Sequence, residues 1–100
     1  MTRILYFGKN PEILPVVLRL INAREDWEGE GSLQLEEIKS RLNEESFNLL
    51  LLGGGLSPSE EAELRAWCQT NHPKLPIIQH FGGGSGLLYN EIEQAFKPTA

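Results

Sequence analysis

The chain has 100 residues, of which 40% are hydrophobic and 23% charged, and its formal net charge is −5. This length fits one domain, residues 1–100, and an acidic chain with scattered basic residues argues against nucleic-acid binding. The single cysteine, Cys68, excludes a disulfide framework, and the apolar stretches are too short to span a membrane. No signal peptide is visible, so we expect a cytoplasmic protein with no membrane partner.

The first apolar run, residues 3–7, ends at Gly8 and predicts a buried strand. Asn10 and Pro11 then mark a helix start, because asparagine caps free backbone N–H groups and proline fits the first turn. Apolar residues at helical spacing continue to Ile21 and predict an amphipathic helix.

The next segment, residues 24–31, is polar apart from Trp27 and fits either a short charged edge strand or a loop. Ser32 precedes a second predicted helix, with Ile38 and Leu42 on its apolar face. Three acidic residues nearby could suggest a metal cluster, but a charge run near a helix start is usually solvated surface. They are Glu28, Glu30 and Glu36.

A second apolar run, residues 47–52, leads directly into Gly53-Gly54-Gly55. An unbroken apolar run of this length is typical of a parallel strand that is buried on both faces. Residues 57–60 form a capping box with a proline at the first helical position, and they predict a helix that ends before Pro73.

The last two predicted elements are a strand at residues 75–81 and a terminal helix after Gly86, with Leu88, Ile92 and Phe96 at steps of four. Strands that alternate with helices predict a three-layer α/β sandwich, in which a small, mostly parallel four-stranded sheet is flanked by helices. The expected core comprises Ile4, Tyr6, Val17, Leu20, Ile38, Leu42, Leu50, Leu52, Leu64, Ile77 and Ile78.

Three segments resemble the receiver domains of response regulators, which have a flavodoxin-like fold. They are residues 4–11, residues 47–52 and His72-Pro73-Lys74-Leu75-Pro76-Ile77-Ile78, the last being close to a His-Pro-x-x-Pro run that often opens the fourth receiver strand. The resemblance covers roughly residues 1–82 in order and spacing. It implies a degenerate, shortened receiver-like domain of sheet order 2-1-3-4, with too little chain for the fourth helix and the fifth strand.

The residues that carry receiver chemistry do not stand at the matched positions. The acidic pair that would hold magnesium corresponds to Gly8 and Lys9, and the phosphoacceptor aspartate corresponds to Gly53. The Ser or Thr after the fourth strand falls near Phe81, and the lysine of the fifth strand has no counterpart. Because magnesium prefers carboxylate oxygens, we expect no metal, no cofactor and no phosphotransfer at this site.

Two glycine triplets are expected at the carboxyl edge of the sheet, where backbone N–H groups could approach an anion or a nucleotide closely. This alternative site comprises Gly53, Gly54, Gly55, Gly82, Gly83, Gly84 and Ser85. The segment lacks a full dinucleotide fingerprint and a P-loop lysine, which favours the alternative that the triplets are flexible turns left after an acidic site was lost.

Cys68 and His80 suggest a nucleophile and a base, but Cys68 lies on the apolar stripe of its predicted helix, where a free cysteine behaves as a small hydrophobe. No second acid or positioned nucleophile accompanies His80, so we expect no catalytic residue and no enzyme. An enzyme of another type stays a third possibility, since a substrate can bring its own chemistry.

The predicted fourth strand would form an edge of the sheet without lysine in its interior, and such an edge either pairs with another chain or is covered. The candidate interface residues are Ile77, Ile78, Phe81, Leu87 and Tyr89, with Trp27 as a further aromatic anchor. We therefore expect a homodimer or a protein partner. The competing expectation is that the terminal helix folds back and covers this edge.

Overall fold

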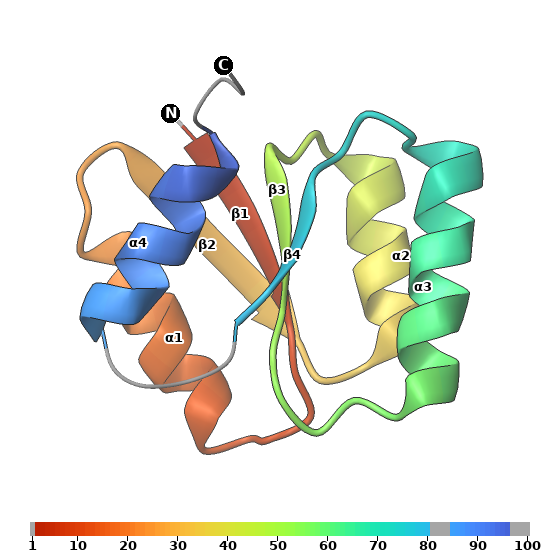
Figure 1. The fold of residues 1–100 in the computed structure, drawn as a ribbon, viewed down its shortest axis with the longest axis horizontal. Helices are drawn as coiled ribbons and strands as arrows, with labels where there is room; N and C mark the ends of the chain where they lie inside the picture. Colours follow the sequence, from red (N-terminus) through yellow and green to blue (C-terminus); the bar gives the residue numbers. More distant parts are fainter. Residues whose placement is uncertain (1, 81–84, 97–100) are drawn as a thin grey trace.

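The computed structural model describes residues 2–80 and 85–96, and Phe81, Gly82, Gly83 and Gly84 of the predicted sites lie outside them. The strands are β1 (Thr2–Phe7), β2 (Trp27–Ser32), β3 (Leu49–Leu52) and β4 (Ile77–Gln79), and the helices are α1 (Ile13–Asn22), α2 (Leu35–Glu44), α3 (Pro58–Asn71) and α4 (Ser85–Ala95). All strand pairs are parallel, in the order β2-β1-β3-β4 (Figure 1). The predicted α/β sandwich and strand order are confirmed. No described helix is long and apolar enough to cross a membrane.

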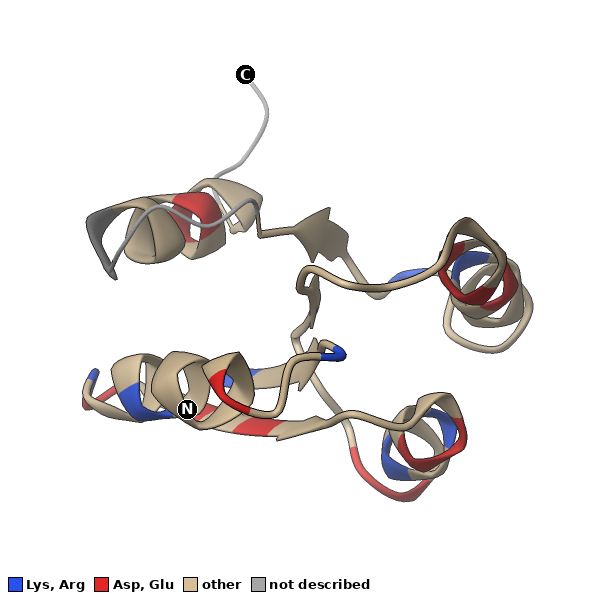
Figure 2. Cartoon of the chain, turned by 90° about the horizontal axis from the view of Figure 1, so that it is seen from below, with Lys and Arg blue, Asp and Glu red and all other residues tan. Residues whose placement is uncertain are grey.

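The sheet separates two pairs of helices, with α1 and α4 on one face and α2 and α3 on the other (Figure 2). Right-handed crossovers explain the first three placements, because the chain moves one way along the sheet through α1 and the other way through α2 and α3. A crossover from β4 to a further strand beside it would have to lie on the face of α3. Since α4 lies on the face of α1, it is not such a crossover.

Each face of the sheet carries its own core. Residues 4–7 of β1 and all of β3 contribute alternately to the two faces, which explains why these stretches are continuous apolar runs. The core under α1 and α4 contains Ile4, Tyr6, Val17, Ile21, Trp27, Leu49, Leu51, Leu88 and Ile92. The core under α2 and α3 contains Leu5, Phe7, Ile38, Leu42, Leu50, Leu52, Leu64 and Cys68.

Three of the expected core residues, Leu20, Ile77 and Ile78, are only partly buried, and this part of the core prediction was wrong. Ile77 and Ile78 belong to the edge strand β4, which has a neighbour on one side only. Phe96 was expected on the apolar stripe of the last helix, but that helix ends at Ala95 and Phe96 is 40% exposed.

The polar segment around Trp27, for which the sequence fits either a strand or a loop, forms the edge strand β2. Trp27, Gly29 and Gly31 alternate along it with more polar residues, and the Trp27 side chain enters the core. A Cβ atom on Gly29 would lie 2.8 Å from Ile21 Cγ2, and one on Gly31 would lie 2.7 Å from the Tyr6 carbonyl oxygen. Glycine is therefore needed at both positions because α1 and β1 approach the strand so closely.

The predicted helix starts contain the expected hydrogen bonds. Asn10 Oδ1 accepts from the backbone N–H of Glu12 at 2.9 Å, although the regular part of α1 begins only at Ile13. Ser57 Oγ accepts from the N–H of Glu60 at 3.1 Å at the start of α3. These contacts satisfy backbone donors that have no partner inside their own helix.

Candidate functional site

The carboxyl ends of β1 and β3 meet at the edge of the sheet where the sequence predicts the glycine site. The backbone N–H of Gly53 donates to the carbonyl of Phe7 at 2.7 Å, and the N–H of Lys9 donates to the carbonyl of Gly54 at 3.3 Å. These two bonds join the loop that follows β1 to the loop that follows β3. The positions matched to the receiver acidic pair and phosphoacceptor are thus neighbours.

The ring of Tyr6 occupies the space beside Gly53. A Cβ atom added to Gly53 would lie 1.9 Å from the Tyr6 hydroxyl oxygen and 2.5 Å from Cζ, and one added to Gly8 would lie 2.8 Å from the same hydroxyl. Tyr6 is only 2% exposed, and its burial raises the pKa of the phenol. No side chain fits at position 53 while Tyr6 holds this position.

Lys9 provides a positive charge at the same edge of the sheet. Its Nζ lies 2.8 Å from Oε2 of Glu60 in the first turn of α3, and both side chains are about one third exposed. Hydrogen bonding by Lys9 holds the pKa of the Glu60 carboxyl below its usual value, with a further contribution from the cap at Ser57. The pair links the loop after β1 to the start of α3.

The glycines of the alternative anion site have different environments. Gly53 is buried and its N–H group is already bound to Phe7, whereas Gly54 and Gly55 are exposed. Gly55 has a φ of 82°, a left-handed conformation that favours glycine. Ser85 begins α4, and the other triplet lies outside the described residues. The anion site stays a prediction.

Cys68 and His80 lie on opposite faces of the sheet. Cys68 is packed in the core under α2 and α3, and its burial raises the pKa of the thiol. His80, just after β4, places Nδ1 at 2.5 Å from Oε1 of Glu91 on α4, which lies on the other face. The two residues therefore do not form a nucleophile and base pair.

The candidate interface residues lie around β4 and α4. Ile77 and Ile78 are half-buried on opposite faces of β4, and Leu87 is 42% exposed. Tyr89 instead holds α4 against α1, because its hydroxyl donates to the carbonyl of Leu20 at 2.8 Å. Tyr89 also packs edge-on against the ring of the buried Trp27, with the centroids 5.8 Å apart, so these two aromatics are largely engaged inside the protein.

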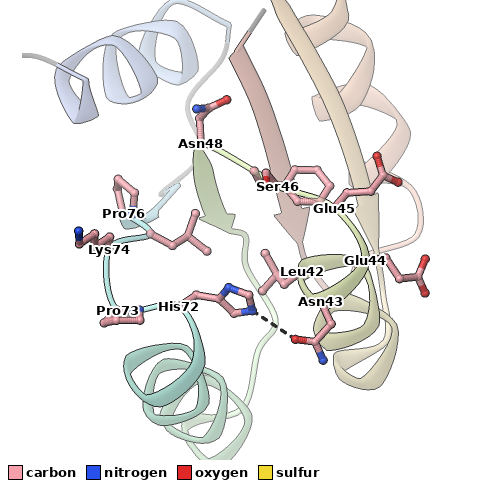
Figure 3. A pocket seen from close by; sticks show the side chains of 12 residues that line it. Leu42, Asn43, Glu44, Glu45, Ser46, Asn48, His72, Pro73, Lys74 and Pro76 are labelled. Atoms are coloured by element: carbon pink, nitrogen blue, oxygen red, sulfur yellow. Dashed lines mark hydrogen bonds between the residues drawn. The ribbon is translucent and has the colours of Figure 1, made fainter.

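A hollow of about 630 Å³ lies at the opposite, amino end of β3 and β4, where the sequence predicts no site (Figure 3). The loop after α2 and the loop after α3 form its walls, and His72 Nε2 lies 3.3 Å from Asn43 Oδ1 across it. Of the charged residues lining it, Glu45 is held by Arg41 at 2.5 Å and by Arg3 at 2.7 Å. Hollows that form where two loops meet leave no periodic signal in a sequence, so this one could not have been predicted.

No protein-family model matches the chain, and no curated protein matches it. Several solved structures have a similar fold. A CheY-like response regulator receiver domain from Methanospirillum hungatei JF-1 superposes with a TM-score of 0.71 at 24% identity, covering 95% of this chain and 75% of that one. The complex of histidine kinase ThkA with the response regulator TrrA gives 0.75 at 14% identity, covering 97% and 100%. A putative pilus assembly protein from Burkholderia thailandensis E264 gives 0.71 at 16% identity, covering 95% and 98%.

The chain therefore has the flavodoxin-like fold of receiver domains, as the resemblance in its sequence implied. Among the described residues it is a shortened form of that fold, with four strands and with α4 on the face opposite to α3. At these identities the likeness shows the fold alone.

Proposed function

We propose that the chain is a non-catalytic, receiver-like signalling or scaffold module that acts through protein contacts in the cytoplasm and has lost the phosphorylation site. The observation that carries the proposal is the Tyr6 ring against Gly53, where an added Cβ atom would lie 1.9 Å from the hydroxyl oxygen. A phosphoacceptor is thus absent from position 53, and the space for one is taken by a core side chain.

Lys9 supports the same interpretation. A receiver-like metal site would need carboxylates after β1, whereas this chain has Gly8 and Lys9 there. The Lys9 ammonium forms an ion pair with the Glu60 carboxylate at 2.8 Å, so a lysine side chain provides the positive charge at this edge of the sheet. Protein contact as the means of action is supported by the fold, since the TrrA structure is a complex of a response regulator with a histidine kinase.

The direct test is incubation of the purified protein with acetyl phosphate and Mg²⁺, followed by intact-mass measurement. We expect no gain of a phosphoryl group. The Gly53→Asp variant should gain none either, because its carboxylate would collide with Tyr6 and no acidic pair stands at residues 8 and 9. A gain of one phosphoryl group by the wild-type protein would overturn the proposal.

A stability measurement tests the filled site independently of phosphorylation. Gly53→Ala should destabilise the fold by about 1–3 kcal/mol, the usual cost of overpacking. The matched control is Gly54→Ala, because an added Cβ there has nothing within 4 Å. In a Tyr6→Leu background the penalty of Gly53→Ala should shrink, and strictly additive effects in this double-mutant cycle would contradict the contact.

A further inference from the structure

The outer edge of β4 carries backbone groups without partners. The carbonyl of Pro76 accepts from the N–H of Leu50 at 3.0 Å, and the N–H of His80 donates to the carbonyl of Leu52 at 2.8 Å. Because successive residues of a strand direct these groups to alternate sides, those of Ile77 and Gln79 point away from β3. In the part of the chain that the structure describes, neither residue has another strand or side chain bound to these groups.

A groove of about 370 Å³ runs beside this edge, between β4 and α4. Its lining residues are Ile78, Gln79, Asn90, Glu91, Gln94 and Ala95. The one carboxylate among them, Glu91, lies 2.5 Å from His80 and is only 17% exposed, and the remaining side chains are amides or apolar. Figure 2 shows no charged residue in β4 itself. The helix thus covers one face of the strand and leaves its hydrogen-bonding edge open.

We propose that β4 pairs antiparallel with β4 of a second copy of this chain, around a two-fold axis that passes beside Ile78. In this register Ile77 of one copy faces Gln79 of the other. Each such pair exchanges two N–H to carbonyl bonds, as in the hydrogen-bonded positions of an antiparallel ladder. All four outward groups of each strand are then satisfied, and the two four-stranded sheets become one.

A second copy fits this groove better than an unrelated strand because the surface is self-complementary. Residues near a two-fold axis lie close to their own counterparts, so a charged side chain there would face a like charge. The amides of Asn90 and Gln94 on α4 carry both a donor and an acceptor, so each can pair with its own counterpart in the second copy. The inference rests on the proposed role in protein contacts and specifies the partner and the surface.

Light scattering on the 100-residue protein tests the pairing, with the expected result of about twice the 11.2 kDa chain mass at high concentration. Gln79→Pro should give a monomer, because proline removes an outward N–H without removing a bond to β3. Gln79→Ala is the matched control, since it also loses the side chain but keeps the N–H, and it should remain dimeric. A wild-type mass of 11.2 kDa at all concentrations, or a folded dimeric Gln79→Pro variant, would overturn the proposal.

A second pair of variants serves if Gln79→Pro fails to fold. Asn90→Glu introduces like charges across the two-fold axis at an exposed helix position and should weaken dimerisation about tenfold or more. Gln69→Glu makes the same charge change on the exposed face of α3 and should leave the dissociation constant unchanged. Equal effects of the two changes would contradict the interface. A monomer that gains no phosphoryl group would overturn the dimer while leaving the proposed function in place.

Discussion

The outward backbone groups of Gly29 in β2 differ from those of Ile77 and Gln79 in β4 in whether another part of the chain binds them. At the β2 edge, the side-chain amide of Asn22 accepts from the N–H of Gly29 at 2.9 Å and donates to its carbonyl at 3.1 Å, so a side chain takes the place of a neighbouring strand. At the β4 edge, no described residue does this for Ile77 or Gln79. The chain itself binds the outward backbone groups of Gly29, whereas those of Ile77 and Gln79 have no partner among the described residues.

The side chains at the two edges differ in the same sense. Glu30 of β2 bridges Arg3, at 2.5 Å, and Arg41, and Glu28 lies 3.4 Å from Arg3. Charged edge strands resist pairing with other chains. The three residues of β4 are uncharged, and Ile77 and Ile78 are half-buried. The two edge strands therefore differ in charge as well as in how their outward backbone groups are bound, and this difference makes β4 the candidate for pairing with a second copy.

The largest expected effect lies between the two edges, in the central strand β3. Leu50 is completely buried, and Leu50→Ala should cost about 2–5 kcal/mol of unfolding free energy. The matched change at the edge is Ile77→Ala, because Ile77 of β4 packs against the same core. It should cost clearly less unfolding free energy, since Ile77 is only partly buried. Urea denaturation measures both, and a Leu50→Ala loss below about 1 kcal/mol would contradict the central position of β3.

The next effect tests the close approach of α1 to β2. Gly29→Ala places a methyl group 2.8 Å from Ile21 Cγ2 and should cost about 1–3 kcal/mol, since a well-packed helix has little room to move. Gly54→Ala, with open space around it, should be neutral or slightly stabilising in the same thermal unfolding assay. A neutral Gly29→Ala would mean that α1 lies farther from the strand.

A smaller effect tests the polar closure of β2. Asn22→Ala removes both side-chain bonds to Gly29 and should cost about 1 kcal/mol. Asn71→Ala is the matched control, because both asparagines end a helix and donate to the carbonyl four residues earlier, at 2.9 Å, but Asn71 caps no strand. If the two variants lose equal stability in urea titrations, the closure of β2 by Asn22 adds nothing.

The smallest effect concerns the ion pairs near β2 at low pH. Arg41 and then Arg3 hold the pKa of the Glu45 carboxyl below its usual 4.5 by hydrogen bonding. The unfolded chain therefore binds more protons than the folded chain in acid. The contribution of this pairing to the free energy of unfolding is complete above about pH 4.5, and it is lost as the pH falls through the pKa of Glu45 in the folded protein. Arg41→Ala should flatten this part of the stability curve. Arg65→Ala, which removes a separate pair with Glu61 on α3, should keep its shape.

The sequence predicted most of the fold because hydrophobic patterning decides it. The apolar runs of β1 and β3 and the Ser57 cap led directly to the observed elements. The β2 strand stayed undecided because its identity depends on tertiary contacts: Gly29 and Gly31 are poor strand residues that are needed only where α1 and β1 come close. Propensity contains no information on such an approach.

At the candidate site, the sequence could predict only which receiver side chains are missing. The missing carboxylates at Gly8, Lys9 and Gly53 can be read from a resemblance to receiver domains. The position of the Tyr6 ring beside Gly53 could not be predicted from this resemblance. Tyr6 lies almost two β-α units before Gly53 in the sequence, and the two residues come close only because β1 and β3 are neighbours in the sheet. One signal was available, namely a single tyrosine in the buried part of β1, residues 4–7, which is followed directly by Gly8.

Amide hydrogen exchange at two protein concentrations tests the difference between the edges most directly. The N–H groups of Ile77 and Gln79 should exchange rapidly in dilute protein and become protected as the concentration rises, because a second copy then binds them. The N–H of Gly29 should show the same protection at both concentrations, because Asn22 holds it within one chain. Rapid exchange of Ile77 and Gln79 at every concentration would contradict the account.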